Sequence, residues 1–258
     1  MYNTIKMEMV DDIAIVKFDR PKALNALNTA MAKELDKLFD GIRNDVNIRG
    51  VILTGEGNSF MAGADISEMK EWKASGGREF ARYSNYVFSK ISDLDKPVIA
   101  AVNGYALGGG LELSLCCDWR IASDKAIFAA PEVTLGIIPS GGGTQRLPRL
   151  IGTGRAKELI FTGKKLTAAD AEKLGIVNCV VSSEKLMDEA INSMREALKN
   201  SSIALKYAKE TIDIGMDMDL KNGIRNEINA VGMVFDSEDR LEGVTAFLEK
   251  RKPCFKNR

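Results

Sequence analysis

Short apolar runs alternate with segments of helical periodicity along the first half of this chain, and this alternation constrains the fold more than any other feature. The runs are typical of buried strands and lie at residues 13–18, 50–54, 98–102 and 119–122. Between them, apolar residues recur every three or four positions at 31–42, and a second helix is expected at 77–93. Strands separated by helices predict crossover connections and a mostly parallel sheet, so the fold class is α/β.

The last third of the chain differs, because helical periodicity dominates after about residue 153. The predicted helices cover 154–161, 167–174, 183–198, 202–214, 220–235 and 240–251. The apolar residues of the later helices include Met216, Met218, Leu220, Ile224, Ile228, Val231 and Phe235. These residues offer more apolar faces than a simple lid over a core needs, so we predict that this part binds another subunit.

Composition excludes several classes of function. A chain of 258 residues forms one large domain, or one domain with a small appendage. Its 36 Lys and Arg residues balance 36 Asp and Glu residues, which argues against nucleic-acid binding as the main function. The chain has no histidine, which excludes Ser-His-Asp and Cys-His triads and histidine-ligated metals. Proton transfer must then use carboxylates, lysine, tyrosine or cysteine.

The cysteines and the chain's N-terminus bear on its compartment. Cysteines at 116, 117, 179 and 254 form no C-x-x-C pair, and we expect free thiols in the reducing cytoplasm. The first twelve residues carry four charges before any apolar run, unlike a signal peptide. Residues 97–117 are nearly uncharged, but four glycines and Asn103 favour a strand, a turn and a buried helix over a membrane span. We expect no membrane association.

Two long segments are almost free of charge, and each contains one glutamate. Charged residues make up 28% of the chain, so a window of 21 residues should hold about six. Residues 97–117 hold only Glu112, and residues 126–145 hold only Glu132. Burial in such surroundings raises a carboxyl pKa toward neutrality, where two glutamates can divide the work of base and acid.

A glycine triplet precedes the first of these glutamates. Gly108, Gly109 and Gly110 offer bare N–H groups at the start of a predicted short helix, which suits a developing oxyanion. Glu112 then lies about one turn inside that helix, near the same cavity. Small residues at 59–66 also permit close approach of a ligand. No Walker A pattern occurs, and no G-x-G-x-x-G follows a strand, so a classical nucleotide site is not supported.

Structural explanations stay open for both signals. Each glutamate could be a buried carboxylate paired with an arginine, such as Arg120 or Arg146, because buried ion pairs also perturb pKa values. The glycines could serve close packing of the backbone against a neighbouring strand.

The sequence resembles the crotonase, or enoyl-CoA hydratase, superfamily almost from end to end. The segments that carry the resemblance are 20–27, 60–66, 103–113, 128–139, 142–147 and 247–253. The resemblance implies a spiral of β-β-α units with the CoA-ester site at residues 1–195, and a helical trimerisation region at 196–258. It further implies a trimer or a dimer of trimers. No metal and no cofactor are implied, because CoA belongs to the acyl-CoA thioester substrate.

The resemblance also implies the roles of site residues. The backbone N–H groups of Ala64 and Gly109 bind the thioester oxygen. Glu112 orients and activates water, and Glu132 exchanges the proton at the α carbon. Further substrate contacts are implied for Lys22, Ala23, Leu24, Ala62, Gly63, Asp65, Ile66, Pro131, Ser140, Phe247 and Lys250. The chain departs from the family at Ser140, where hydratases often have glycine, and at Ser67, where some members have a lysine near the CoA phosphates.

The implied activity is the reversible syn addition of water to a 2-enoyl-CoA, giving a 3-hydroxyacyl-CoA, because both glutamates are retained. Residues 20–25 and 249–252 are similar to bacterial short-chain enzymes that handle 3-hydroxybutyryl-CoA, so crotonyl-CoA is the expected substrate. An enoyl-CoA isomerase, or a hydratase of cyclic or branched acyl groups, is an alternative, since the same glutamates can move a proton without adding water. A non-catalytic relative that binds RNA is a further alternative, against which the zero net charge and the two glutamates speak.

Overall fold

The computed structural model describes residues 2–258, and its core is built on a sheet that is mostly parallel. From edge to edge this sheet contains β1 (Ile5–Val10), β2 (Ile13–Phe18), β3 (Gly50–Gly55), β5 (Val98–Val102), β7 (Trp119–Ser123) and β10 (Cys179–Val181). β1 pairs antiparallel with β2, and the other neighbours pair in parallel. The strands and the mostly parallel sheet predicted from the sequence are therefore confirmed. β1 and β10 were not predicted, because four of the six residues of β1 are exposed, so it lacks a buried apolar run, and β10 has only three residues.

A second, smaller sheet carries the short strands of the fold. Its order is β4 (Ser59–Ala62), β6 (Tyr105–Leu107), β8 (Ile127–Ala129) and β9 (Leu166–Thr167). β4, β6 and β8 pair in parallel, and each follows directly after a strand of the first sheet. The chain therefore repeats a unit of two strands followed by helix. These strands have two to four residues, too few for a periodicity to appear in the sequence.

Helices connect and cover the strands. The helical elements of the core are η1 (Pro21–Ala23), α1 (Thr29–Asn44), α2 (Ile66–Met69), α3 (Ala74–Ser92), α4 (Gly109–Ser114), η2 (Glu132–Leu135), α5 (Gly143–Ile151), α6 (Thr153–Thr162), α7 (Ala168–Lys173), η3 (Ser183–Lys185) and α8 (Leu186–Leu198). The helices predicted at 31–42 and 77–93 are confirmed as α1 and α3. The helix predicted from residue 183 begins with a 3-10 turn and becomes α-helical at Leu186.

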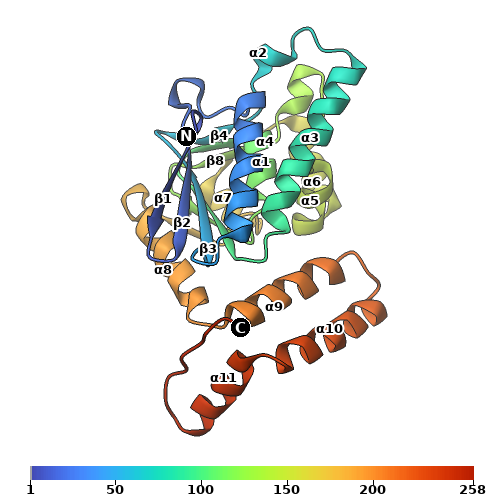
Figure 1. The fold of residues 1–258 in the computed structure, drawn as a ribbon. Coiled ribbons are helices and arrows are strands. Elements are labelled where there is room, and N and C mark those ends of the chain that lie inside the picture. Colours follow the sequence, from blue (N-terminus) through green and yellow to red (C-terminus); the bar gives the residue numbers. More distant parts are fainter. Residues whose placement is uncertain (1) are drawn as a thin grey trace.

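The first sheet is buried on both faces because its side chains alternate between two hydrophobic clusters. In β2, Ala14 and Val16 belong to the cluster beneath α1 and α3, which lie side by side in Figure 1. Ile13 and Ile15 belong to the opposite cluster, which includes Met194 of α8. Strands buried in this way read as continuous apolar runs, which is why the sequence predicted them.

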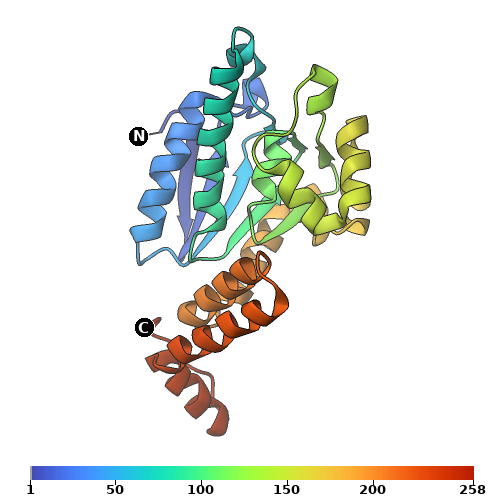
Figure 2. The same cartoon turned by 90° about the vertical axis from the view of Figure 1, so that its right-hand side faces the viewer.

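The C-terminal helices lie apart from the two sheets in both views of the molecule (Figures 1 and 2). They are α9 (Ser202–Gly215), α10 (Leu220–Phe235) and α11 (Glu238–Leu248). The helices predicted at 202–214 and 220–235 are confirmed, whereas the one predicted to reach residue 251 ends at Leu248. Within residues 2–258, no helix has both the length and the apolar character needed to cross a bilayer. The division into 1–195 and 196–258 stays a prediction.

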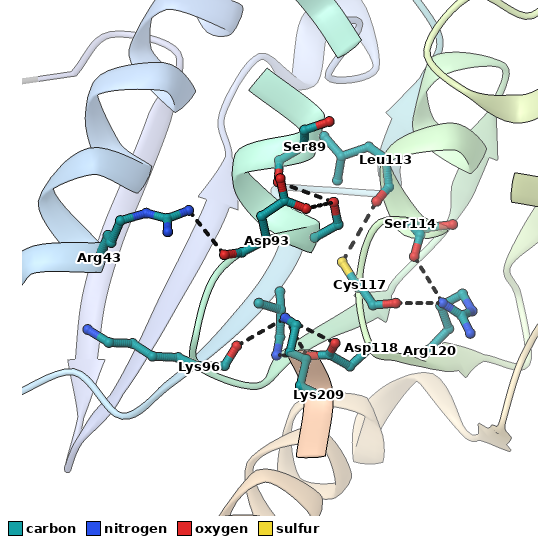
Figure 3. A network of polar contacts seen from close by, with 12 residues as sticks. Arg43, Ser89, Asp93, Lys96, Leu113, Ser114, Cys117, Asp118, Arg120 and Lys209 are labelled. Atoms are coloured by element: carbon teal, nitrogen blue, oxygen red, sulfur yellow. Dashed lines mark hydrogen bonds and ion pairs between the residues drawn. The ribbon is translucent and has the colours of Figure 1, made fainter. Parts of the chain in front are cut away.

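An ion pair fastens α9 to the core, as Figure 3 shows. The Lys209 ammonium lies 3.1 Å from the Asp118 carboxylate and donates to the carbonyl of Lys96 at 3.3 Å. Asp118 in turn accepts a hydrogen bond from the Val98 N–H at 2.6 Å. The neighbouring Arg120 donates to three backbone carbonyls. The start of the C-terminal helical region is thus held at the N-terminal ends of β5 and β7.

Candidate active site

Glu112 lies in the first turn of α4, and two backbone amides from a distant loop hold its carboxylate. Its side chain is buried, and its Oε1 accepts hydrogen bonds from the N–H groups of Gly141 at 2.8 Å and Gly143 at 2.7 Å. A Cβ atom at either glycine would lie within 3 Å of a Glu112 carboxylate oxygen, at 2.8 Å for Gly141 and 2.9 Å for Gly143. Glycine is therefore required at both positions for their N–H groups to approach the carboxylate.

Glu132 begins the turn η2 and is held very differently. Its Oε2 is buried and has no hydrogen-bond partner among residues 2–258. Burial raises the pKa of Glu132 to about 7; its own N–H opposes the rise, and the charge of Glu112 adds to it. A carboxyl group in this state exchanges its proton readily near neutral pH.

The two glutamates differ in the groups that oppose the rise of their pKa values. Burial also raises the pKa of Glu112, but the N–H groups of Gly143 and Gly141 and the charge of Arg146 oppose that rise. These groups stabilise the ionised form of Glu112, and Glu132 lacks comparable donors among the described residues. The surroundings of Glu112 thus favour its ionised form more than those of Glu132 do.

The ion-pair explanation for the glutamates is not supported by the structure. Arg120 donates to the carbonyls of Ser114, Cys117 and Ile176. Arg146 acts on Glu112 through its charge, and its Nε has no hydrogen-bond partner within the described part of the chain.

The three glycines before Glu112 serve different purposes. Gly108 has a φ of +50°, and a Cβ there would lie 3.0 Å from Oε1 of Glu132. Gly110 packs against β4 so closely that a Cβ would lie 1.9 Å from the Met61 carbonyl oxygen. A Cβ at Gly109 would make only ordinary contacts, the nearest at 3.7 Å. Close packing thus explains Gly110, but it does not explain Gly109.

Two backbone N–H groups, those of Ala64 and Gly109, lie close together beside the glutamates. The amide of Leu27 donates to the Gly63 carbonyl, and the amide of Asp65 donates to the Leu27 carbonyl, both at 2.8 Å. Ala64 lies between these bonds, and its own N–H donates to none of residues 2–258. Gly109 is the first residue of α4, so its N–H has no partner within the helix. A Cβ at Gly109 would lie 3.7 Å from the Ala64 nitrogen, so both amides border one space.

The glutamates and both amides line a single cavity of about 140 Å³. Its apolar wall is formed by Leu27, Ile66, Met69, Phe80, Phe88, Leu107, Leu135, Ile137 and Ile138. The free N–H groups can polarise a carbonyl, and the glutamates can add and remove protons beside it. An apolar chain attached to such a carbonyl would lie against the wall.

The small second sheet sets the spacing of these groups. Ala64 lies two residues after β4, Gly109 two residues after β6, and Glu132 three residues after β8. The last residues of these parallel strands are in register, with Ala62 opposite Leu107 and Leu107 opposite Ala129. The site is therefore built at the adjacent C-terminal ends of three paired strands.

Comparison with known proteins identifies the family that shares this architecture. The model of the enoyl-CoA hydratase/isomerase family matches residues 8–258. This chain belongs to that family. It is 48% identical to a short-chain-enoyl-CoA hydratase of Clostridium acetobutylicum over 99% of each chain, and 44% identical to a crotonyl-CoA hydratase of Syntrophomonas wolfei over 98% of each. The crystal structure of an enoyl-CoA hydratase from Bacillus anthracis matches it with a TM-score of 0.96 at 41% identity, covering 99% of this chain and 100% of the other. The crotonase-like fold is thus confirmed.

The predicted CoA contacts of this hydratase/isomerase family member fall into two groups. Those that line the cavity are Ala62, Gly63, Ile66, Pro131 and Ser140. Asp65 caps α2 and forms an ion pair with Arg20 at 2.9 Å. Residues 22–24 lie at η1, and the Leu24 carbonyl accepts a hydrogen bond from the Ala62 N–H at 3.0 Å. These segments therefore border the cavity wall without lining it, and their contacts with CoA stay predictions.

Phe247 and Lys250 lie at the end of α11 and do not line the cavity of their own chain within the described residues. The Phe247 side chain is 82% exposed. Figure 1 shows α11 at the opposite end of the molecule from α2, which borders the cavity. A contact between either residue and bound CoA therefore requires a second copy of the chain.

Sequence reasoning missed several residues of the site. Gly141 and Gly143 were not recognised as the donors to Glu112, although the three consecutive glycines at 141–143 carry the same signal as those at 108–110. Phe80, Ser84 and Phe88 line the cavity from α3. Their spacing of four marks one helix face, but spacing alone does not tell a cavity wall from a core.

Proposed function

We propose that this chain is a short-chain enoyl-CoA hydratase that adds water reversibly, in the syn sense, to a 2-enoyl-CoA. The observation that carries the proposal is one cavity lined by two unpartnered N–H groups and two glutamates. The names of the relatives at 48% and 44% identity support the reaction and a four-carbon acyl group. CoA arrives with the substrate, and the proposal includes neither a metal nor another cofactor. The four cysteines carry free thiols, which suits the reducing cytoplasm where we place the reaction.

In this proposal the Ala64 and Gly109 N–H groups bind the thioester oxygen. Negative charge develops on that oxygen when a nucleophile attacks the β carbon, because the electrons of the double bond shift toward the carbonyl. Fixed amides stabilise this charge without reorganising, and the loss of one such donor typically lowers a rate about 10²–10³-fold. Both amides belong to backbone anchored by the second sheet, so their position does not depend on side-chain rotamers.

The two glutamates supply the proton transfers. The ionised Glu112 takes a proton from water while the water oxygen forms a bond to the β carbon. Glu132 gives its proton to the α carbon, which discharges the enolate and completes the 3-hydroxyacyl-CoA. Both carboxylates line one cavity, and the proposal places them on the same face of the double bond, so that the oxygen and the proton are added syn. After the product leaves, Glu112 releases its proton to solvent and Glu132 takes one up, which restores the starting state.

We also propose that the enzyme assembles as a trimer or a dimer of trimers. Large apolar side chains are exposed on the C-terminal helices, including Met216 at 69%, Leu220 at 79% and Leu248 at 74%. Many large apolar side chains exposed on neighbouring helices are typical of a protein interface. The same assembly would bring Phe247 and Lys250 to the CoA bound by a neighbouring copy. A monomer mass in light scattering at micromolar concentration would contradict the assembly.

The test of the function is a rate comparison on defined CoA esters. The purified protein should hydrate crotonyl-CoA, and longer 2-enoyl-CoA esters should react more slowly. A parallel assay with a 3-enoyl-CoA tests for isomerisation. Isomerisation without hydration would assign the chain to the isomerases of the family, and the absence of both activities would refute the proposed reaction.

A further inference from the structure

One peptide unit connects Glu112 to the side chain of Asn85. The peptide between Ser140 and Gly141 donates its N–H to Oε1 of Glu112 at 2.8 Å. Its carbonyl, which belongs to Ser140, accepts a hydrogen bond from Nδ2 of Asn85 at 2.5 Å. The N–H and C=O of a trans peptide point in opposite directions, so Asn85 and Glu112 hold this unit from its two sides.

The orientation of the Asn85 amide is fixed by its partners. Its Nδ2 donates to the Ser140 carbonyl and also to the carbonyl of Ala81, at 2.8 Å, one turn earlier in α3. A reversed amide would place its oxygen against two carbonyl oxygens, which only accept hydrogen bonds. Nδ2 therefore faces the loop, and α3, with 19 residues, provides a rigid base for the contact.

The loop that presents the N–H groups needs such an anchor. Residues 141–143 are all glycine, and glycine loses more conformational freedom on ordering than any other residue. A hydrogen bond to the carbonyl also polarises the peptide and strengthens the donation from its N–H. Oδ1 of Asn85 and Nε of Arg146 both lie within 3.5 Å of the point where a Gly142 Cβ would be, so the two side chains pack behind the loop.

We propose that Asn85 is a positioning residue for hydration, and that it acts by holding the Gly141 N–H on the Glu112 carboxylate. Asn85 does not line the cavity within the described residues, so it acts through the Ser140–Gly141 peptide. The proposal rests on the proposed role of Glu112 as the base that activates water.

The test replaces Asn85 and compares it with a matched asparagine. Asn44 donates to the carbonyl of Asp40 one turn earlier in α1, at 2.8 Å, and it is exposed. Asn44→Ala removes the same helix contact without touching the loop, so its kcat and pH profile should equal those of the unmodified protein. Asn85→Ala should lower kcat for crotonyl-CoA hydration about tenfold, the effect expected from one hydrogen bond, with KM nearly unchanged.

The pH profile separates positioning from a purely structural role. The Gly141 N–H stabilises ionised Glu112 and so lowers its pKa. Loss of this donor should move the acid limb of the kcat profile to higher pH in Asn85→Ala. Asn85→Leu has nearly the same shape and adds no charge but cannot donate, so it should show the same shift. It carries the test if the alanine variant does not fold. Folded variants with unchanged kcat and an unmoved acid limb would overturn the proposal.

A titration of the Glu112 carboxyl carbon by NMR makes the test independent of the reaction. If Asn85→Ala raises the pKa of Glu112 while the unmodified protein hydrates no enoyl-CoA, the positioning role of Asn85 stands and the proposed function fails. If the unmodified protein is an active hydratase and the pKa of Glu112 is the same in both proteins, the function stands and the positioning role of Asn85 is refuted.

Discussion

Replacing Gly109 by proline removes one N–H group of the proposed oxyanion site, and the position of Gly109 at the start of α4 predicts that the fold tolerates the change. The Gly109 N–H makes no hydrogen bond among residues 2–258, so its loss leaves no internal acceptor unsatisfied. Gly109 is also the first residue of α4, the helical position that proline suits best. We expect Gly109→Pro to fold and to lower kcat about 10²–10³-fold, which corresponds to roughly 3–4 kcal/mol of transition-state stabilisation.

Two further glycine variants make this prediction specific. Gly109→Ala keeps the N–H, and its methyl group would lie 3.7 Å from the Ala64 nitrogen, an ordinary contact that crowds the oxyanion space. Its loss of activity should therefore be smaller than that of the proline variant. In Gly110→Ala the methyl group would lie 1.9 Å from the Met61 carbonyl oxygen. That variant should lose thermal stability although both donors remain.

The assay measures crotonyl-CoA hydration and thermal unfolding of all three variants, with circular dichroism to verify the fold. The expected pattern is lost activity with retained stability for Gly109→Pro, and lost stability for Gly110→Ala. A folded Gly109→Pro protein with normal turnover would rule out this amide as a donor to the thioester oxygen. Activity that falls only in proportion to stability would restore the packing explanation for Gly109.

Four further outcomes follow from the glutamates and the C-terminal helices. Glu112→Gln and Glu132→Gln should each lower the hydration rate about 10²–10⁴-fold with little change in CoA-ester affinity, because the amide keeps the shape but cannot exchange protons; near-normal turnover of either variant excludes its assigned role. The kcat for hydration should fall as pH rises through about 7, since Glu132 must carry the proton that it delivers, and a flat profile across neutrality would contradict this role. Burial raises the pKa of Glu132 from its ordinary 4.5 to about 7, so the unmodified protein loses stability as pH rises between these two values. Glutamine does not titrate, so the melting temperature of Glu132→Gln should rise relative to that of the unmodified protein over this pH range. The same difference in melting temperature at pH 4.5 and pH 7 would refute the raised pKa. Ile228→Asp, at a position 64% exposed on α10, should produce monomers in light scattering, and an unchanged mass would place the interface elsewhere.

Four strands of the first sheet and the long helices could be predicted from the sequence, whereas β1, β10 and the second sheet could not. Strands such as β5, buried on both faces, leave an uninterrupted apolar run that marks them in any sequence. β6 and β8 have three residues each, and their place is determined by pairing with strands distant in the chain. Pairing of this kind leaves no local periodicity.

The residues of the site could likewise be predicted only where the local sequence marks them. Glu112 and Glu132 were found because a charge stands out in an apolar segment. The donors of Gly141 and Gly143 come from the backbone, which every residue possesses, and they lie 29 and 31 positions from Glu112 in the chain. Asn85 is a polar residue on a partly exposed helix, and its contact with Ser140 spans 55 positions. No local pattern in the sequence distinguishes such a residue from an ordinary surface asparagine.

The shared register of β4, β6 and β8 has a consequence for how this scaffold can change its chemistry. In the proposed reaction the groups that bind the thioester are main-chain atoms, and the groups that transfer protons are side chains of α4 and η2, which follow β6 and β8. A point substitution at Glu112 or Glu132 can therefore alter the reaction while the polarising apparatus survives intact. A one-residue slip of β6 would instead displace the Gly109 amide and Glu112 together. Single substitutions can thus change the type of reaction, whereas the pairing of the strands preserves the main-chain N–H groups proposed to activate the acyl group.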